Sequence, residues 1–293
     1  MKRTKSCIPV TLVAILLVMS ACSQSSSNDG TTATTNTADI STPAAPATTP
    51  TTPTTPTTPN EPANTQYSFS EGTLTTATLA TITGTWVETI NNDAGAYLLT
   101  ETWIFDASGN FTRIIDQTTN YSGTPKYSWE GERGTASFAD GVVTLTISTM
   151  GKSSTAAYNA ATATWDSITK IEKKNAVIID GKLCVEAAKR VGTGTGITGT
   201  WEELSSTEYP SMLIPADYAK HTYVFTASGY SDEFITSGSP TFDTIDYTTD
   251  SAYTYTVGPD NTIKSTAPFG TFTNTIRISG DWLNLGAGAT KVS

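Results

Sequence analysis

The chain carries the same strand-forming motif twice, and this internal repeat limits the folds that are open to it. Residues Ile82–Trp86 recur identically as Ile197–Trp201, and Thr102–Gly109 has an echo in Thr222–Gly229. The order of the echoes is kept, but their spacing drifts from 115 to 120 residues. This pattern predicts a duplicated domain with altered loops rather than a solenoid, which keeps a fixed short period.

A third echo closes each copy. Val177–Leu183 corresponds to Ile276–Trp282, and the two segments contain the dipeptides Asp180–Gly181 and Ser279–Gly280. Asp140–Gly141 is a further dipeptide of this kind. Because two-residue hairpin turns need positive φ angles, the three dipeptides predict tight turns between antiparallel strands.

The segments between the turns have the pattern of strands. Val143, Leu145 and Ile147 alternate with Thr or Ser, which gives one apolar and one hydroxyl face. Only the Ala-rich stretch Ser153–Thr164 suits a helix, and Thr164 equally suits the start of another strand. Regularly spaced short strands with glycine turns are typical of a sandwich or barrel, so the predicted fold class is all-β.

The start of each copy resembles a known family. A Gly-Thr-Trp motif (Gly84 to Trp86, and Gly199 to Trp201) opens a first strand, and a Phe-x-x-x-Gly hairpin follows it. This is similar to the bacterial lipocalin-like domain. The resemblance implies two tandem antiparallel β-barrels of eight strands, in which the first-strand Trp packs across the closed end. The other end of such a barrel opens to a cavity for small, usually apolar ligands.

We therefore expect one lipocalin-like barrel in residues 67–192 and a second in residues 193–293. The family often places an Arg of the last strand over the Trp. Arg277 is the candidate in the second copy, whereas the aligned residue of the first copy is Ile178. Trp86 and Trp201 are expected to plug the core rather than stack on a ligand.

The second copy has five more residues between its first two strands. The insertion falls near Tyr209–Pro215 and contains Met212, Leu213 and Ile214, an unusual apolar run for a surface loop. Our hypothesis is that these residues form a lid over a cavity or dock a partner. The alternative is that they cap their own barrel without a ligand.

The N-terminus resembles a lipoprotein signal. Lys2, Arg3 and Lys5 precede the mostly apolar run Ile8–Met19, which is too short to span a membrane. Met19–Cys22 then resembles the lipobox of bacterial lipoproteins.

The lipobox resemblance implies that residues 1–21 are a signal peptide cleaved after Ala21. Cys22 would then carry a diacylglycerol, and acyl chains such as palmitate would act as a lipid anchor. Two or three acyl chains hold a protein stably on a membrane. Ser23 follows the cysteine, which under the family's sorting rule favours the outer membrane of the cell envelope, at its periplasmic face or the cell surface.

Residues 22–66 are rich in Ser, Thr, Ala and Pro, with four consecutive Thr-Thr-Pro triplets ending at Pro59. Such a composition cannot bury enough apolar surface to fold, so a disordered linker is expected. Its threonines also permit O-glycosylation.

Composition excludes several kinds of function. Without residues 1–21 the chain has 14 basic and 27 acidic residues, and this charge of −13 argues against nucleic-acid binding. His221, the single histidine, is aligned with Glu101 and is expected to be a strand residue. Cys184 lies in an apolar run and is expected to be a buried, inert thiol. We expect no enzyme, no metal site and no cofactor.

Two functions remain open for the barrels. The first is binding of a small apolar ligand in one or both cavities. The rival is a structural or adhesive display protein whose outer faces meet a protein or glycan partner. An interior filled by Trp103, Phe105, Tyr223 and Phe225 would favour the rival, whereas an empty apolar cavity would favour the ligand.

Overall fold

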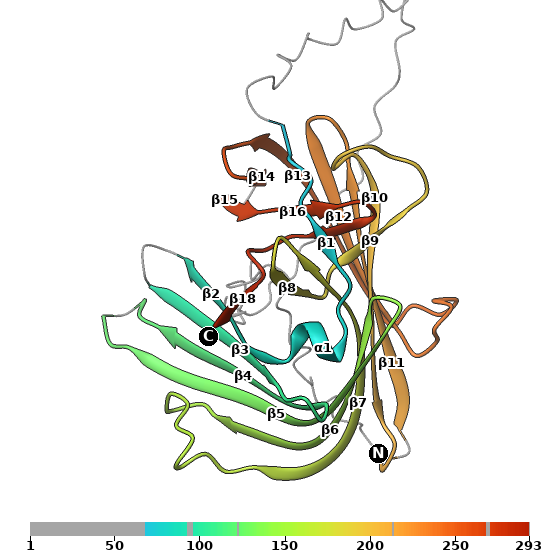
Figure 1. Cartoon of the computed structure of the whole chain (residues 1–293). Coiled ribbons are helices and arrows are strands. Elements are labelled where there is room, and N and C mark those ends of the chain that lie inside the picture. Colours follow the sequence, from blue (N-terminus) through green and yellow to red (C-terminus); the bar gives the residue numbers. More distant parts are fainter. Residues whose placement is uncertain (1–67, 93–95, 122, 213, 268–269, 293) are drawn as a thin grey trace, which may run out of the picture. The chain divides into compact units, whose positions relative to one another are not determined.

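The computed structural model describes residues 68–92, 96–121, 123–212, 214–267 and 270–292 (Figure 1). The expected signal peptide, Cys22 and the linker lie outside these residues. The described residues belong to one compact unit, Ala63–Ser293. Apart from a single helical turn, α1 (Leu79–Ile82), every regular element in them is a β-strand, which confirms the all-β fold class.

The first half of this unit forms a closed antiparallel barrel (Figure 1). Seven consecutive strands pair in order, and an eighth strand from the chain end joins the last to the first. A two-residue strand, β1 (Leu74–Thr75), pairs with Ile178 and Ile179 outside this ring. The barrel strands are β2 (Gly84–Asn92), β3 (Tyr97–Phe105), β4 (Asn110–Thr119), β5 (Lys126–Ala139), β6 (Val142–Ser153), β7 (Asp166–Ile179), β8 (Lys182–Val185) and β18 (Ala289–Val292).

Strand β18 is the terminal strand of the second copy, yet it closes the barrel of the first. Thr290 pairs with Val87 of β2 on one side and with Lys182 of β8 on the other. Ala289, which pairs with Leu183, is buried. The first barrel therefore depends on residues about two hundred positions away from its first strand.

The second half receives a strand in return. Its strands are β10 (Gly199–Tyr209), β11 (Ile214–Phe225), β12 (Gly229–Ser237), β13 (Tyr247–Val257), β14 (Thr262–Ala267), β15 (Gly270–Thr275), β16 (Arg277–Ser279) and β17 (Trp282–Asn284). The last strand of the first copy, β9 (Ala188–Val191), pairs with both β10 and β17. The two copies thus exchange their terminal strands.

The expectation of two closed barrels is wrong, because the described strands close only one. Among the described residues, β15 pairs with β14 and β16 pairs with β17, but no ladder joins β15 to β16. The hairpin β14–β15 has six residues in each strand, whereas β6 and β7 have 12 and 14. A ladder between β7 and β10 links the halves, so a single sheet runs through both copies.

Most of the local predictions are confirmed. Val143, Leu145 and Ile147 are buried, and Asp140–Gly141 and Asp180–Gly181 have positive φ angles. In the third turn the pairing of Ser279 with Trp282 shows that Gly280–Asp281 is the turn, one residue later than expected.

Two local predictions are wrong. Residues 154–165 contain no helix, and β7 begins at Asp166. The insertion near Tyr209–Pro215 does not form a long loop, because it lengthens the β10–β11 hairpin to 11 and 12 residues. In the insertion, cross-strand pairing outweighs the local preference of Pro for loops. Residues 154–165 instead form an irregular connection between β6 and β7.

Trp86 and Trp201 occupy equivalent surroundings. Both are buried, and each indole Nε1–H donates to the carbonyl four residues earlier, Ile82 at 2.6 Å and Ile197 at 2.8 Å. Each also lies within the apolar core of its own half. The structure therefore supports the repeat that the sequence predicts.

The Trp201→Phe variant tests the contribution of the indole hydrogen bond. Because Phe keeps most of the apolar surface but leaves the Ile197 carbonyl unpaired, we expect a loss of about 1–3 kcal/mol in the free energy of unfolding. Urea titration of the variant measures this loss, and an unchanged midpoint would contradict it.

Candidate functional site

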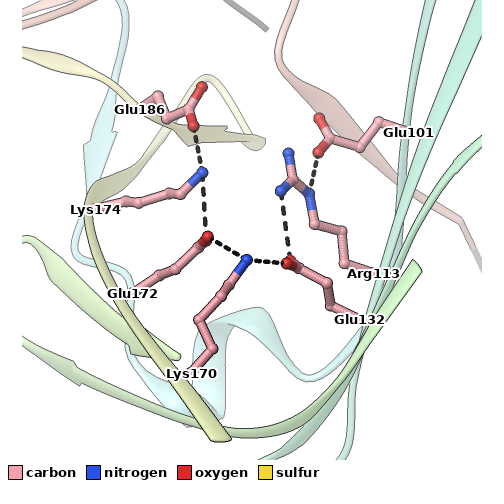
Figure 2. Close-up of polar contacts among 7 residues, drawn as sticks. All are labelled: Glu101, Arg113, Glu132, Lys170, Glu172, Lys174 and Glu186. Carbon is pink, nitrogen blue, oxygen red and sulfur yellow. Dashed lines mark hydrogen bonds and ion pairs between the residues drawn. The ribbon is translucent and has the colours of Figure 1, made fainter. Parts of the chain in front are cut away.

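A chain of seven charged side chains lies in the interior of the first half (Figure 2). Six of them come from four barrel strands, and the seventh follows β8. Six of the seven are buried, and Glu186 is half-buried. The members are Glu101 of β3, Arg113 of β4, Glu132 of β5, Lys170, Glu172 and Lys174 of β7, and Glu186.

The Arg113 guanidinium joins two carboxylates at one end of the chain. Its Nε donates to Oε1 of Glu101 at 2.6 Å. Its Nη1 lies 3.6 Å from Oε2 of Glu132. The guanidinium also stacks on the Trp103 ring, 4.8 Å from its centroid.

Two lysines continue the chain along β7. Lys170 Nζ contacts Oε1 of Glu132 at 2.5 Å and Oε1 of Glu172 at 2.7 Å. Lys174 Nζ lies 3.6 Å from Oε2 of Glu172 and 2.5 Å from Oε1 of Glu186. Charges of opposite sign therefore alternate along the whole row of seven side chains. This alternation offsets the free-energy cost of removing each charged group from water.

Strand register explains why these side chains meet. Trp103, Arg113 and Glu132 are direct cross-strand partners, so they share one face of the sheet. On β7, the spacing of two between Lys170, Glu172 and Lys174 points all three in one direction. Sequence reasoning missed this site, although that Lys-x-Glu-x-Lys spacing is a readable signal of it.

Glu186 completes the chain from a strained position. Its φ angle is 67°, in the left-handed region that residues other than glycine rarely adopt. Its N–H donates to the carbonyl of Asn175, and the Asn175 side chain donates to the carbonyl of Ala187. These bonds hold the carboxylate toward Lys174.

The charged chain shifts the pKa of Arg113, Lys174 and Glu172 toward the charged forms. Burial alone would lower the pKa of Arg113 and of Lys174, but the neighbouring carboxylates outweigh burial and raise both. Burial alone would raise the pKa of Glu172, but Lys174 and Lys170 lower it to about 2.

The pKa of Glu172 predicts loss of stability in acid. Because its folded-state pKa lies below the ordinary value of 4.5, its contribution is fully present above pH 4.5 and is lost as the pH falls toward about 2. Urea unfolding of the unchanged chain and of Glu172→Gln, compared across this range, should give a stability difference that shrinks with falling pH. A difference independent of pH would contradict the assignment.

The second half has a buried polar pair at the equivalent positions. His221 is the sequence equivalent of Glu101. Tyr223 pairs with Asp232 across the strands, just as Trp103 pairs with Arg113. Asp232 is therefore the equivalent of Arg113. His221 Nε2 contacts Asp232 Oδ1, and its Nδ1 lies 2.8 Å from the Tyr223 hydroxyl. His221 is thus a buried residue held on both ring nitrogens.

Glu203 lies beside this pair, since it is the cross-strand partner of His221. Burial raises the pKa of Glu203 well above its ordinary value, and the charges of Glu186 and Asp232 add to that effect.

The glycines of the repeated motif have the backbone that the turn into each first strand requires. Gly84 and Gly199 have φ angles of 126° and 130°, which side chains other than glycine disfavour.

The expectation that Arg277 covers Trp201 is wrong. Arg190 of β9 lies over the Trp201 ring at 3.9 Å, whereas Arg277 Nε donates to the carbonyl of Ala287. In the first half the corresponding cation is Lys291 of β18, 5.4 Å from the centroid of the Trp86 ring. The strand exchange supplies both cations, and the echo of Ala188–Val191 in Ala289–Val292 is the sequence signal that would have indicated it.

Arg190 also anchors the segment between the copies. Its guanidinium donates to the carbonyls of Gly196 and Thr198, at 2.5 and 2.8 Å. The glycine-rich run Gly192–Gly196 is thus held against the second half.

Of the three candidate lid residues, the structure describes the side chain of one. Met212 is 52% exposed in the turn between β10 and β11. Ile214 is the first residue of β11, and Leu213 lies outside the described residues, so the lid hypothesis stays a prediction.

The charged chain is organised as paired ions rather than as a metal centre. Among the described residues, no cluster of three or more His, Cys, Asp or Glu side chains has the arrangement of a metal site. In the same part of the chain, no helix has the length and apolar character needed to cross a bilayer.

Cys184 is buried and unbridged. Burial raises the pKa of its thiol to about 12, so the reactive thiolate is suppressed near neutral pH. We expect a thiol reagent to label Cys184 in the native chain at least a hundredfold more slowly than after unfolding in urea. Equal rates, followed by mass spectrometry, would contradict this prediction.

Comparison with known proteins finds no relative. No family model matches the chain, and neither a curated protein nor a solved structure is significantly similar to it.

Proposed function

We propose that this protein is a non-enzymatic display protein of the bacterial cell envelope. A lipid on Cys22 would anchor it, the Thr/Pro-rich segment would separate the anchor from the folded unit, and the outer faces of the sheet would meet a protein partner. The observation that carries this proposal is the close packing of buried aromatic side chains in both halves.

Buried aromatic side chains pack against one another in both halves. Trp103 and Phe105 are buried and stack with their ring centroids 5.8 Å apart. In the second half, Phe225 stacks on Tyr230 at 4.7 Å, and Tyr223 is buried beside His221. Interiors packed in this way give stability and shape rather than a preformed cavity.

Binding of a small apolar ligand is the alternative function. The seven-residue charged chain disfavours it in the first half, because an apolar ligand there would desolvate the ions without replacing their contacts. A lid formed by Met212, Leu213 and Ile214 belongs to this alternative.

Native mass spectrometry of the full chain, extracted from bacterial membranes in mild detergent, tests the proposal. We expect the mass of the polypeptide from Cys22 onward plus its lipid, with no further small molecule. Cys22→Ser should move the protein from the membrane to the soluble fraction. A stoichiometric co-purified apolar compound would favour the alternative, and membrane association of Cys22→Ser would refute the anchor.

A further inference from the structure

Strand β13 has an edge that no described strand covers. It pairs with β12 from Tyr247 to Thr254, but with β14 only from Thr254 to Val257. Along Thr248–Ala252, the side away from β12 therefore has no strand partner among the described residues. The side chains of four of these five residues are exposed, all but Ser251. Backbone N–H and C=O groups on such an edge are a template for a further strand.

The first copy shows what occupies the equivalent edge. In the first copy, Arg113 pairs with Glu132 of β5. Asp232, the equivalent of Arg113, pairs with Ser251 of β13, so Ser251 is the equivalent of Glu132. The edge Thr248–Ala252 therefore corresponds to Trp129–Arg133 of β5. The first-copy segment is covered by Thr149–Ser153, the far end of β6. Strand β14 ends at Ala267 and lacks this extension. The second copy is thus short of one antiparallel strand of about five residues.

The outer face beside this edge is acidic. Glu233 and Asp250 are direct cross-strand partners, and both are exposed. Like charges directly opposite each other destabilise a strand pair. Neither carboxylate forms an ion pair with a cation among the residues that the structure describes. A cation on the next strand would lie beside Asp250 and offset this repulsion.

We propose that the edge Thr248–Ala252 binds an extended segment of a partner protein that carries Lys or Arg at alternate positions. The segment would add to the sheet antiparallel to β13, with its main chain bonded to the edge and a basic side chain beside Asp250 and Glu233.

Two other occupants fit the edge less well. Residues 23–66 of this chain contain no Lys or Arg, and a proline at every third position from Pro50 to Pro59 opposes strand pairing. A second copy joined edge to edge through β13 would bring its own Asp250 and Glu233 to the same acidic surface.

The inference rests on the proposed display function, because it names the chemistry of the displayed protein's partner. Its test is separate, since peptide binding in solution requires neither the lipid nor the membrane. Failure of peptide binding would leave the anchoring and mass-spectrometry results unaffected, and the reverse also holds.

Fluorescence anisotropy with two labelled nine-residue peptides provides the test. One alternates Thr with Lys and the other alternates Thr with Glu, and each is titrated with the full chain in detergent micelles. We expect saturable binding of the Lys peptide, at least tenfold tighter than that of the Glu peptide. Equal affinities, or no binding of the Lys peptide, would overturn the proposal.

Charge variants locate the site. Glu233→Gln combined with Asp250→Asn should weaken the binding of the Lys peptide at least fivefold. Asp166→Asn combined with Asp260→Asn removes the same charge from exposed positions elsewhere and should leave the affinity unchanged. Equal weakening by both pairs would mean general attraction to an acidic protein and would refute the edge.

Backbone methylation of the peptide tests strand addition without altering the protein. N-methyl groups on alternate residues remove main-chain donors from one edge of the peptide only. One of the two alternate patterns should abolish binding and the other should retain it. If both patterns bind as well as the parent peptide, main-chain pairing with β13 is excluded. Pairing with a second copy would instead appear as a β13-dependent dimer in sedimentation.

Discussion

A chain that ends after Gly288 is expected to lose the closure of the first barrel, although β18 belongs to the second copy. The truncation removes five pairings, three with β2 and two with β8. It also removes the buried Ala289 and the Lys291 ammonium over Trp86. With about 1 kcal/mol for each net backbone hydrogen bond, a loss on the order of 3–5 kcal/mol in the free energy of unfolding follows.

Hydrogen exchange identifies where the truncated chain loosens. Amides of Thr85–Val87 in β2 and of Lys182–Leu183 in β8 should lose protection, because their partners are gone. The Thr290→Pro variant should act in the same direction, since Thr290 pairs with strands on both sides, and Thr290→Val is its matched control. If exchange increases only in the second half, β18 does not close the first barrel.

The Arg113→Met variant is expected to destabilise the chain by about 3–5 kcal/mol, because it leaves buried carboxylates without their cation. Glu101 loses a contact of 2.6 Å, and Glu132 loses its second cation. Chemical denaturation followed by tryptophan fluorescence measures the loss. Adding Glu101→Gln to Arg113→Met should recover part of it, since the double variant no longer buries the unpaired Glu101 charge.

Lys173→Met is the matched control for the buried chain. Lys173 lies on β7 between Glu172 and Lys174 of the charged chain, but its side chain points outward. Half of this side chain is exposed, and its Nζ lies 3.9 Å from Oε1 of Glu208. Exposed ion pairs contribute about 0–1 kcal/mol, so this variant should remain close to the unchanged chain. Comparable losses in the two variants would show that burial of the ions does not determine their contribution.

The sequence predicted features that depend on a period of two. Alternation placed Val143, Leu145 and Ile147 in the core, and an apolar run placed Cys184 there. The repeated motif predicted that Trp86 and Trp201 would have like surroundings, and their hydrogen bonds agree. These predictions hold because the face of a side chain in a strand follows from its neighbours along the chain.

The charged chain was missed for a different reason. Each of its members looks like an ordinary strand residue, and the spacing of Lys170, Glu172 and Lys174 shows only that they share a face. Whether that face is the interior depends on Arg113 and Glu132, which reach it from other strands.

Local pattern by itself determined most of the strands and turns, the duplication and the apolar residues that face inward. Only the tertiary structure decided which strand lies beside which. The two exchanged strands, Ala188–Val191 and Ala289–Val292, have nearly equivalent sequences. By strand propensity alone, each of them could pair with β2 or with β10. Distant backbone edges compete for pairing, and this competition decides three features. They are the exchange of the two strands, the interruption between β15 and β16, and the uncovered edge of β13. That competition depends on burial and on the lengths of the intervening hairpins, and no local pattern records it.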